Sequence, residues 1–180
     1  IMLKIKMKRS ILVLVSLLFV LSLFSCQTNV KDNDSPRIIN IINFVRQTDY
    51  RVEKSDSLLF DATQKELDLV NSYSFPATFL LQYDALINPK YQSLFLDAIK
   101  HYVDIEVGCW FEITQPHVEK AGLKWRGEHS WVSTANIAFS TGYTQQEREA
   151  LVDVYMDEFK SIFGVYPSSV GAWFIDSYTL

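Results

Sequence analysis

Cysteine and histidine are scarce in this sequence, and each shortage limits what the chain can be. Only two cysteines occur in 180 residues. One of them, Cys26, lies in a targeting motif, so the chain has no internal disulfide framework. The three histidines form neither an H-x-H nor an H-x-x-x-H motif. The sequence therefore lacks the closely spaced ligands that are typical of zinc sites.

Other familiar functional patterns are missing as well. The chain has no glycine-rich phosphate loop and no G-x-S-x-G nucleophile motif. Four cationic residues, Lys4, Lys6, Lys8 and Arg9, are concentrated at the amino terminus, and no basic stripe follows them. The net charge of the whole sequence is -4. We therefore expect no nucleic-acid partner.

The amino terminus has the three-part organisation of a secretory signal. Its cationic start is followed by the apolar run Ile11–Phe24 (ILVLVSLLFVLSLF). This run is shorter than the roughly 20 residues that a membrane-spanning helix needs, and a transmembrane anchor is the alternative interpretation. We assign residues 1–25 to a signal peptide.

A short segment that ends in Cys26 follows this signal. Leu23-Phe24-Ser25-Cys26 resembles the lipobox of bacterial lipoproteins, with Phe24 in place of the usual small residue. The resemblance implies that Cys26 carries a lipid and that the protein is located in the cell envelope, anchored to a bacterial membrane. Exposure of the anchored protein at the cell surface is one alternative. The rest of the segment 26–36 is polar (QTNVKDNDSP), which predicts a flexible tether.

Residues 37–180 alternate between predicted strands and helices. Short apolar runs predict strands at 38–45, 77–81, 104–113 and 169–175. Apolar residues at helical spacing predict helices at 56–73, 89–102 and 144–163. Thr144 and Glu147 form a capping box at the start of the last helix. The segment 114–143 lacks clear periodicity and is predicted to be a long connection.

This alternation predicts an α/β fold made of parallel β-α-β units. More narrowly, we expect an incomplete (β/α) barrel. The last predicted strand ends close to Leu180, so its outer edge would lack a covering helix. Together with Ile1 at the start, this leads us to expect the N-terminal part of a larger barrel domain over residues 37–180.

Four segments resemble the polysaccharide deacetylases, within the glycoside hydrolase/deacetylase superfamily. They are Ile38–Val45, Pro76–Leu81 (PATFLL), Glu106–Gly108 (EVG) and Phe159–Pro167 (FKSIFGVYP). In this family a strand ending in aspartates precedes a P-A-T-F strand, an E-I-G strand and a helix ending in F-G-x-x-P. The resemblance covers residues 37 to about 176, is closest to an uncharacterised branch found in bacterial lipoproteins, and implies a deacetylase-type barrel acting in a carbohydrate context.

The chain departs from that family at the metal ligands. The family's first strand ends in two aspartates, whereas here Phe44-Val45-Arg46 stands at the matching place and Asp49 is the nearest acid. The positions that match the family's paired histidines are Trp110 and Thr114. The resemblance therefore does not carry deacetylase metal chemistry onto these residues.

Polar residues follow the predicted strands, where the functional groups of parallel barrels are found. Two carboxylates across a glycosidic bond can hydrolyse it, one as the acid and the other as base or nucleophile. We predict Glu112 and Asp176 as the catalytic pair, with Asp49 third. The alternative for each carboxylate is a helix cap or an ion pair with arginine.

Further residues are candidates for binding a carbohydrate or a metal. We predict substrate contacts from Arg46, Gln82, Asp84, Trp110 and Trp173, and Trp125 and Trp131 are further candidates for a sugar cleft, with core packing as the alternative. A divalent metal bound by His117, Glu112 and Asp49 is a weaker alternative. Gly108 predicts a bulge or a close approach of backbone to ligand, and Cys109 a buried, inert thiol.

The sequence thus supports two hypotheses of function. The first is an exported, lipid-anchored protein that hydrolyses a glycosidic or ester bond in a poly- or oligosaccharide. The second is a non-catalytic glycan-binding module on a degenerate deacetylase-like fold. A structural lipoprotein domain without a small ligand is a third interpretation.

Overall fold

The computed structural model describes residues 40–49, 52–102, 104–127 and 135–179. The predicted signal peptide (1–25), the tether (26–36), Cys26 and Trp131 lie outside the described residues. Within the described ranges, no helix combines the length and the apolar character needed to cross a membrane.

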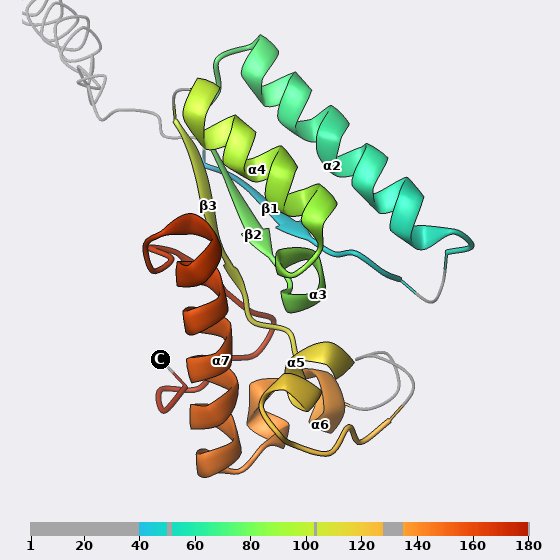
Figure 1. Cartoon of the computed structure of the whole chain (residues 1–180), viewed down its shortest axis with the longest axis vertical. Coiled ribbons are helices and arrows are strands. Elements are labelled where there is room, and N and C mark those ends of the chain that lie inside the picture. Colours follow the sequence, from blue (N-terminus) through green and yellow to red (C-terminus); the bar gives the residue numbers. More distant parts are fainter. Residues whose placement is uncertain (1–39, 50–51, 103, 128–134, 180) are drawn as a thin grey trace, which may run out of the picture. The chain divides into compact units, whose positions relative to one another are not determined.

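Four parallel strands form one sheet in the order β1-β2-β3-β4 (Figure 1). They are β1 (Ile41–Val45), β2 (Ala77–Leu81), β3 (Ile105–Trp110) and β4 (Val170–Gly171). The sheet curls into a half-barrel whose strands alternate with helices. The predicted α/β class and the parallel direction of the strands are therefore confirmed.

The helices follow the strands along the chain, and α2 and α4 lie side by side over the sheet in Figure 1. The longer ones are α2 (Ser55–Ser72), α4 (Pro89–His101) and α7 (Gln145–Phe163). The prediction of a long connection at 114–143 is wrong, because its described parts contain α5 (Gln115–Lys120), α6 (Ala135–Ala138) and the 3-10 turn Ser140–Gly142. These helices are too short to give a periodic apolar pattern. A one-turn helix, α3 (Tyr83–Leu86), follows β2 directly.

One face of the sheet packs against the helices and forms the hydrophobic core. Val45, Phe79 and Cys109, one from each of three neighbouring strands, are buried on this side. Tyr91 and Phe95 of α4 and Tyr155 of α7 belong to the same core. Consecutive residues of a strand point to opposite faces of the sheet. The strand residues that alternate with Val45, Phe79 and Cys109 therefore face the concave side of the half-barrel.

Helix α7 begins and ends as its sequence predicts. The Thr144 hydroxyl accepts from the Glu147 backbone N–H, and the Glu147 carboxylate accepts from the Thr144 N–H at 2.8 Å. Gly164 closes the helix with φ 78°. These local signals, together with the buried residues Leu151, Tyr155 and Phe159, fix the helix against the sheet.

Strand β4 is much shorter than predicted. Only Val170 and Gly171 pair with β3, opposite Cys109 and Trp110, so the predicted strand over 169–175 is wrong in its length. β3 has ended by this point, because the Glu112 N–H donates to the Trp110 carbonyl within a tight turn. Beyond Gly171 the chain folds toward α7, where Arg148 forms an ion pair with Asp176.

Gly108 lies where β3, β4 and Leu80 approach one another most closely. A Cβ atom at this position would lie 2.3 Å from the Ser169 Oγ atom, 2.5 Å from the Ser169 carbonyl oxygen and 2.7 Å from a Leu80 methyl carbon. The close approach predicted for Gly108 is therefore to a neighbouring strand. The lack of a side chain lets Leu80 fill the concave face.

We predict that Gly108→Ala destabilises the protein by about 3 kcal/mol, the upper end of the usual range for overpacking, because the added methyl must displace the Ser169 backbone directly before β4. The matched comparison is Gly164→Ala, where a Cβ meets nothing within 4 Å and only the positive φ opposes it; its expected cost is about 1 kcal/mol. Urea unfolding of the full chain measures both. Equal costs at the two positions would contradict the close strand packing.

Candidate functional site

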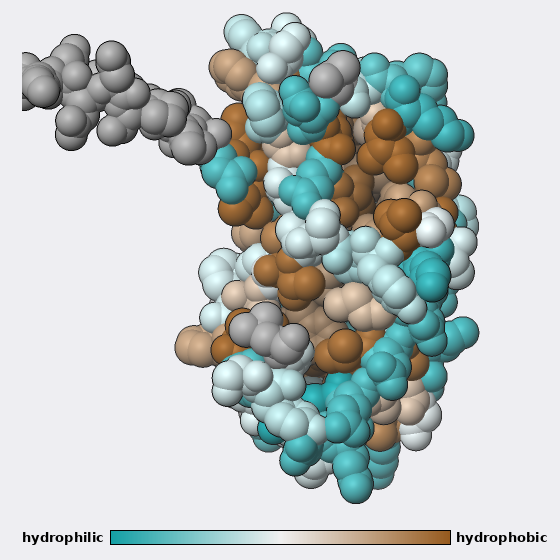
Figure 2. Space-filling view, turned by 90° about the vertical axis from the view of Figure 1, so that its left-hand side faces the viewer, coloured by the Kyte–Doolittle hydropathy of each residue, from teal (hydrophilic) through white to brown (hydrophobic). Residues whose placement is uncertain are grey.

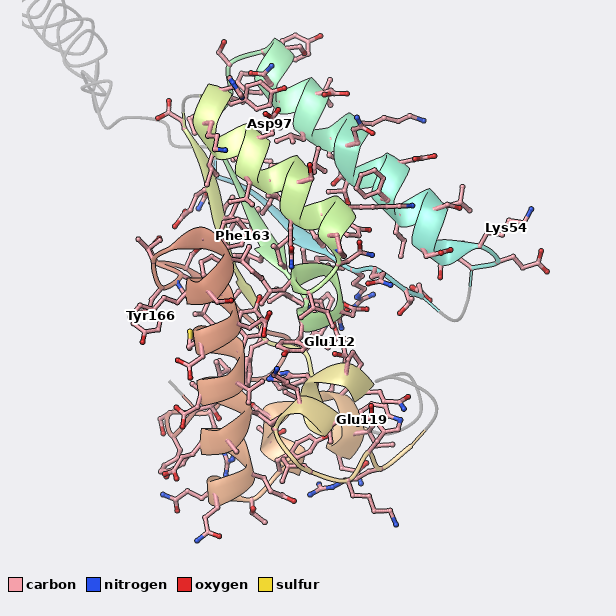
Figure 3. The ribbon with its side chains drawn as sticks, in the orientation of Figure 1. Lys54, Asp97, Glu112, Glu119, Phe163 and Tyr166 are labelled. Atoms are coloured by element: carbon pink, nitrogen blue, oxygen red, sulfur yellow. The ribbon has the colours of Figure 1, made fainter. Side chains whose placement is uncertain are left out.

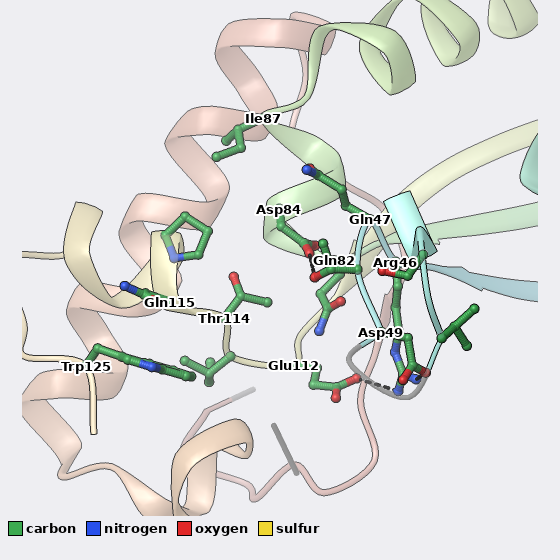
Figure 4. Close-up of a pocket in the computed structure, with 15 residues that line it drawn as sticks. Arg46, Gln47, Asp49, Gln82, Asp84, Ile87, Glu112, Thr114, Gln115 and Trp125 are labelled. Atoms are coloured by element: carbon green, nitrogen blue, oxygen red, sulfur yellow. Dashed lines mark hydrogen bonds and ion pairs between the residues drawn. The ribbon is translucent and has the colours of Figure 1, made fainter. Parts of the chain in front are cut away.

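A cavity of about 500 Å³ opens at the carboxyl ends of β1, β2 and β3 (Figure 4). Parallel strands bring these ends to one edge, so residues far apart in sequence line one space. Five of the predicted site residues line it: Arg46, Asp49, Gln82, Asp84 and Glu112. The lining also includes Thr48, Thr114 and Trp125.

An ion pair between Arg46 and Glu112 spans the ends of β1 and β3. The Arg46 Nη2 atom donates to the Glu112 Oε2 atom at 3.0 Å, and the two side chains are only 10% and 1% exposed. The Trp110 indole N–H donates to the same Glu112 oxygen at 3.0 Å. Glu112 thus lies among the strand ends and short helices, away from peripheral residues such as Lys54 and Tyr166 (Figure 3).

Among the described residues, the Arg46 guanidinium lies close to Asp49 and Phe44 as well. Its Nη1 atom lies 3.9 Å from an Asp49 carboxylate oxygen, and its central carbon lies 4.8 Å from the centre of the Phe44 ring. Removing one partner of a buried ion pair leaves an uncompensated charge and typically costs about 3–5 kcal/mol. Arg46 and Glu112 are therefore held in fixed positions at the floor of the cavity.

Asp84 is a buried carboxyl group with an unusual proton affinity. Its Oδ1 atom accepts from the Ala85 backbone N–H at 2.8 Å, and its Oδ2 atom accepts from the Thr48 hydroxyl at 3.3 Å. Burial raises the pKa of Asp84 to about 6, and the negative charge of Glu112 adds to this, while hydrogen bonds from the Ala85 backbone, the Thr48 hydroxyl and the Gln47 backbone act in the opposite direction. Asp84 can therefore give or accept a proton near neutral pH.

Two neutral groups in the lining have unused hydrogen-bonding capacity. The Thr114 Oγ1 atom and the Trp125 Nε1 atom are buried, and neither has a hydrogen-bond partner among the described residues. Buried polar atoms normally have partners. The two groups are suited to a ligand with oxygen atoms, such as a sugar hydroxyl or an ester carbonyl.

The structure does not bring Asp176 to this cavity, although the sequence analysis paired it with Glu112. Asp176 forms an ion pair with Arg148, and its other oxygen accepts from the Tyr178 and Thr179 backbone N–H groups. The reason is the short β4, which ends five residues before Asp176. The carboxylates that share the cavity are Asp49, Asp84 and Glu112.

Trp110 and Trp173 also lie outside the cavity lining. Trp110 stacks on Phe44 with ring centres 5.1 Å apart, and Trp173 meets both rings edge to face. This cluster lies on the concave face of the half-barrel. Trp110 still influences the site, because its indole N–H fixes Glu112.

His117 is a core residue rather than a cavity residue. Its Nε2 atom lies 2.7 Å from the Leu151 carbonyl oxygen, and its ring stacks on Tyr83 with centres 4.5 Å apart. Burial lowers the pKa of His117 to about 4. Within the described ranges there is no group of three or more His, Cys, Asp or Glu side chains that could hold a metal ion.

Some lining residues were not predicted from the sequence. Thr48 lies three residues after the end of β1, between Arg46 and Asp49, so its position after a strand was an available signal. Thr114 was noted only as a place where the family has a histidine. Its buried hydroxyl could not be anticipated, because it depends on how β3 leads into α5 and on Trp125, which lines the same cavity and packs against the core.

Asp84 and His117 give opposite pH dependences of stability over nearly the same range. Asp84 binds protons more tightly in the folded state, so its contribution falls as pH rises from about 4 to about 6. His117 binds protons more weakly when folded, so its contribution rises from about pH 4 to about pH 6.5. Each shift corresponds to about 3 kcal/mol.

We therefore predict a weak pH dependence in the wild type and a steep one in a variant. Asp84→Asn should leave the His117 effect alone, so that the free energy of unfolding increases by about 3 kcal/mol between pH 4 and pH 6.5. Urea unfolding across this range provides the measurement, with Asp68→Asn on the exposed face of α2 as the control. A D84N profile parallel to the wild type would refute the raised pKa of Asp84.

Comparison of the chain with protein-family models, with curated proteins and with solved structures gives no match.

Proposed function

We propose that this protein is an exported, lipid-anchored hydrolase that cleaves a glycosidic or ester bond in a poly- or oligosaccharide. The observation that carries the proposal is the convergence of Asp49, Asp84 and Glu112 on one cavity at the carboxyl edge of a parallel half-barrel. Carboxyl groups in such a position supply the acid and base of hydrolysis. The deacetylase-like sequence segments support a carbohydrate as substrate.

In this proposal Asp84 is the proton donor. Hydrolysis at neutral pH requires a group that is still partly protonated, and the pKa of about 6 at Asp84 meets this requirement. Asp49, whose side chain is 12% exposed, is the base that activates water or the nucleophile that attacks the substrate. If the bond is glycosidic, either mechanism needs Asp49 to act on the face of the sugar ring opposite Asp84.

Arg46 and Glu112 are the groups that orient the substrate. The Trp110 indole N–H donates to Glu112, and the Arg46 guanidinium lies over the Phe44 ring. These contacts hold the ion pair in place, so it can hold a sugar hydroxyl in one position. The Thr114 hydroxyl and the Trp125 indole N–H supply further hydrogen bonds from the other wall. A rigid and preorganised lining of this kind lowers the cost of aligning a flexible oligosaccharide.

Glycan binding without catalysis is the second candidate. One observation favours it: the Glu112 carboxylate is already engaged by Arg46 and Trp110. A binding module would keep the cavity and its hydrogen bonds but release the ligand unchanged.

We predict that Asp84→Asn lowers turnover at least about 100-fold, because it removes the proton that the leaving group needs. The same variant should be at least as stable as the wild type above pH 6, since the buried charge is gone. Product analysis over a panel of acetylated and unacetylated oligosaccharides measures turnover. Asp68→Asn is the control.

The alternatives separate in the same assay. Asp49→Asn should reduce turnover to a similar degree, whereas Asp176→Asn tests the pairing that the sequence suggested and should change it little. Unchanged turnover in Asp84→Asn and Asp49→Asn would remove both from the mechanism. Ligand binding by the wild type with no product from any oligosaccharide would favour the binding module.

Lipid attachment at Cys26 is tested separately. When the full chain is produced in a bacterium supplied with a labelled fatty acid, the protein should carry the label and sediment with membranes. Cys26→Ala should abolish both results, because the thiol that receives the lipid is gone. Cys109→Ala is the matched control, since Cys109 is buried in β3. Label retained in Cys26→Ala would contradict the anchor.

A further inference from the structure

Large apolar side chains are exposed at the amino edge of the sheet, where β2 and β3 begin. Leu69 and Tyr73 at the end of α2 are 57% and 64% exposed, and Phe75, which leads into β2, is 50% exposed. Ile99 in the last turn of α4 is 40% exposed. The Tyr73 and Phe75 rings stack with centres 5.6 Å apart, and Leu69 lies one helical turn before Tyr73. Adjoining exposed apolar side chains of this kind mark interaction sites.

These residues lie at the end of the strands opposite the cavity. In a parallel sheet, each helix leaves the carboxyl end of one strand and returns the chain to the amino end of the next. The last turns of α2 and α4 therefore lie near the starts of β2 and β3 (Figure 1), whereas the cavity lies at the carboxyl ends. Apolar residues also reach the surface among hydrophilic ones on the side shown in Figure 2, so exposure alone does not identify a partner.

The chain from the predicted lipid anchor enters the sheet at this same edge. β1 begins at Ile41, and Cys26 precedes Asn40 by 14 residues. A flexible polar chain of this length has a root-mean-square span of roughly 20 Å, compared with roughly 40 Å across a domain of this size. A lipid on Cys26 would therefore keep the amino edge close to the membrane.

We propose that the amino edge of the sheet rests on the membrane that holds this lipid, with Leu69, Tyr73, Phe75 and Ile99 in the headgroup layer. Tyrosine and other aromatic side chains suit this layer, because it is apolar on one side and wet on the other. The lipid supplies the attachment, and the apolar side chains supply a second contact that favours one orientation of the domain.

This orientation would point the cavity away from the bilayer. The carboxyl ends of β1, β2 and β3 lie opposite their amino ends, so the cavity would open toward the aqueous phase. The substrate that fits this geometry is a glycan in the aqueous phase rather than the head group of a lipid in the same bilayer. This consequence rests on the proposed hydrolase activity, whereas the orientation rests only on the lipid anchor.

A fluorescent label at position 73 tests the orientation. The lipidated full chain with Tyr73→Cys is labelled with a nitrobenzoxadiazole and reconstituted in phosphatidylcholine vesicles. Only position 73 reacts, because Cys109 is buried and a lipid occupies the Cys26 thiol. The matched control is Leu58→Cys, since Leu58 is 53% exposed in the first turn of α2, at the other end of the helix. We expect a shift of emission to shorter wavelength and quenching by brominated acyl chains at position 73, and neither at position 58.

A second set of variants removes the apolar contact. Adding Leu69→Lys and Phe75→Lys to labelled Tyr73→Cys should abolish the shift and the quenching, because charged side chains avoid the acyl region. Circular dichroism checks that each variant is folded. Equal spectra at positions 73 and 58 would overturn the proposal, as would a shift at position 73 that needs no vesicles, which would identify a protein surface as the occupant.

Failure of the lipid anchor gives a different result from failure of the orientation. A chain that carries no lipid and stays off the vesicles would overturn the proposal through its anchor, and the fatty-acid labelling of Cys26 identifies this case. A lipidated chain that binds the vesicles but leaves position 73 in water would overturn the orientation alone. No substrate enters either measurement, so both are independent of the turnover assay.

Discussion

The buried ion pair between Arg46 and Glu112 connects the fold of this protein to its candidate site. It joins the end of the first strand to the turn after the third and passes across the end of the second, where Gln82 begins the next helix. An arginine and a glutamate that are only 10% and 1% exposed are tolerated because each neutralises the other and Trp110 satisfies the shared oxygen. Arg46 and Glu112 can meet because the parallel strands β1, β2 and β3 end at the same edge of the sheet. Both side chains of the pair line the cavity.

Burial around this pair also sets the chemistry of Asp84. The core that packs α3 and α4 against the sheet removes water from the Asp84 carboxyl, which moves its pKa toward neutrality. The same packing buries His117 deep in the core and lowers its pKa. Two ionisable groups near each other in the fold thus shift in opposite directions for one reason, which is that burial penalises the charged form of each.

The sequence contained many of the elements of this fold but not all of their lengths. The capping box at Thr144 and the glycine at the end of α7 act over a few residues, so they could be identified without knowing the rest of the chain. The apolar runs of β1 and β2 could be identified for the same reason. The length of β4 could not be identified in this way. The composition of 169–175 suits a strand, but a strand also needs a neighbour to pair with, and only Val170 and Gly171 have one in β3.

What the sequence determined by itself was local: the alternation of strands and helices, the helix ends, and the placement of Arg46, Asp49, Gln82, Asp84 and Glu112 after strands. Their convergence was expected from the rule that parallel strands end at one edge. Tertiary structure alone decided that Asp176 pairs with Arg148, that His117 stacks in the core on Tyr83, and that Asp84 carries the raised pKa. The physical reason is that partners and burial depend on contacts between residues distant in the chain, and no local pattern in the sequence records them.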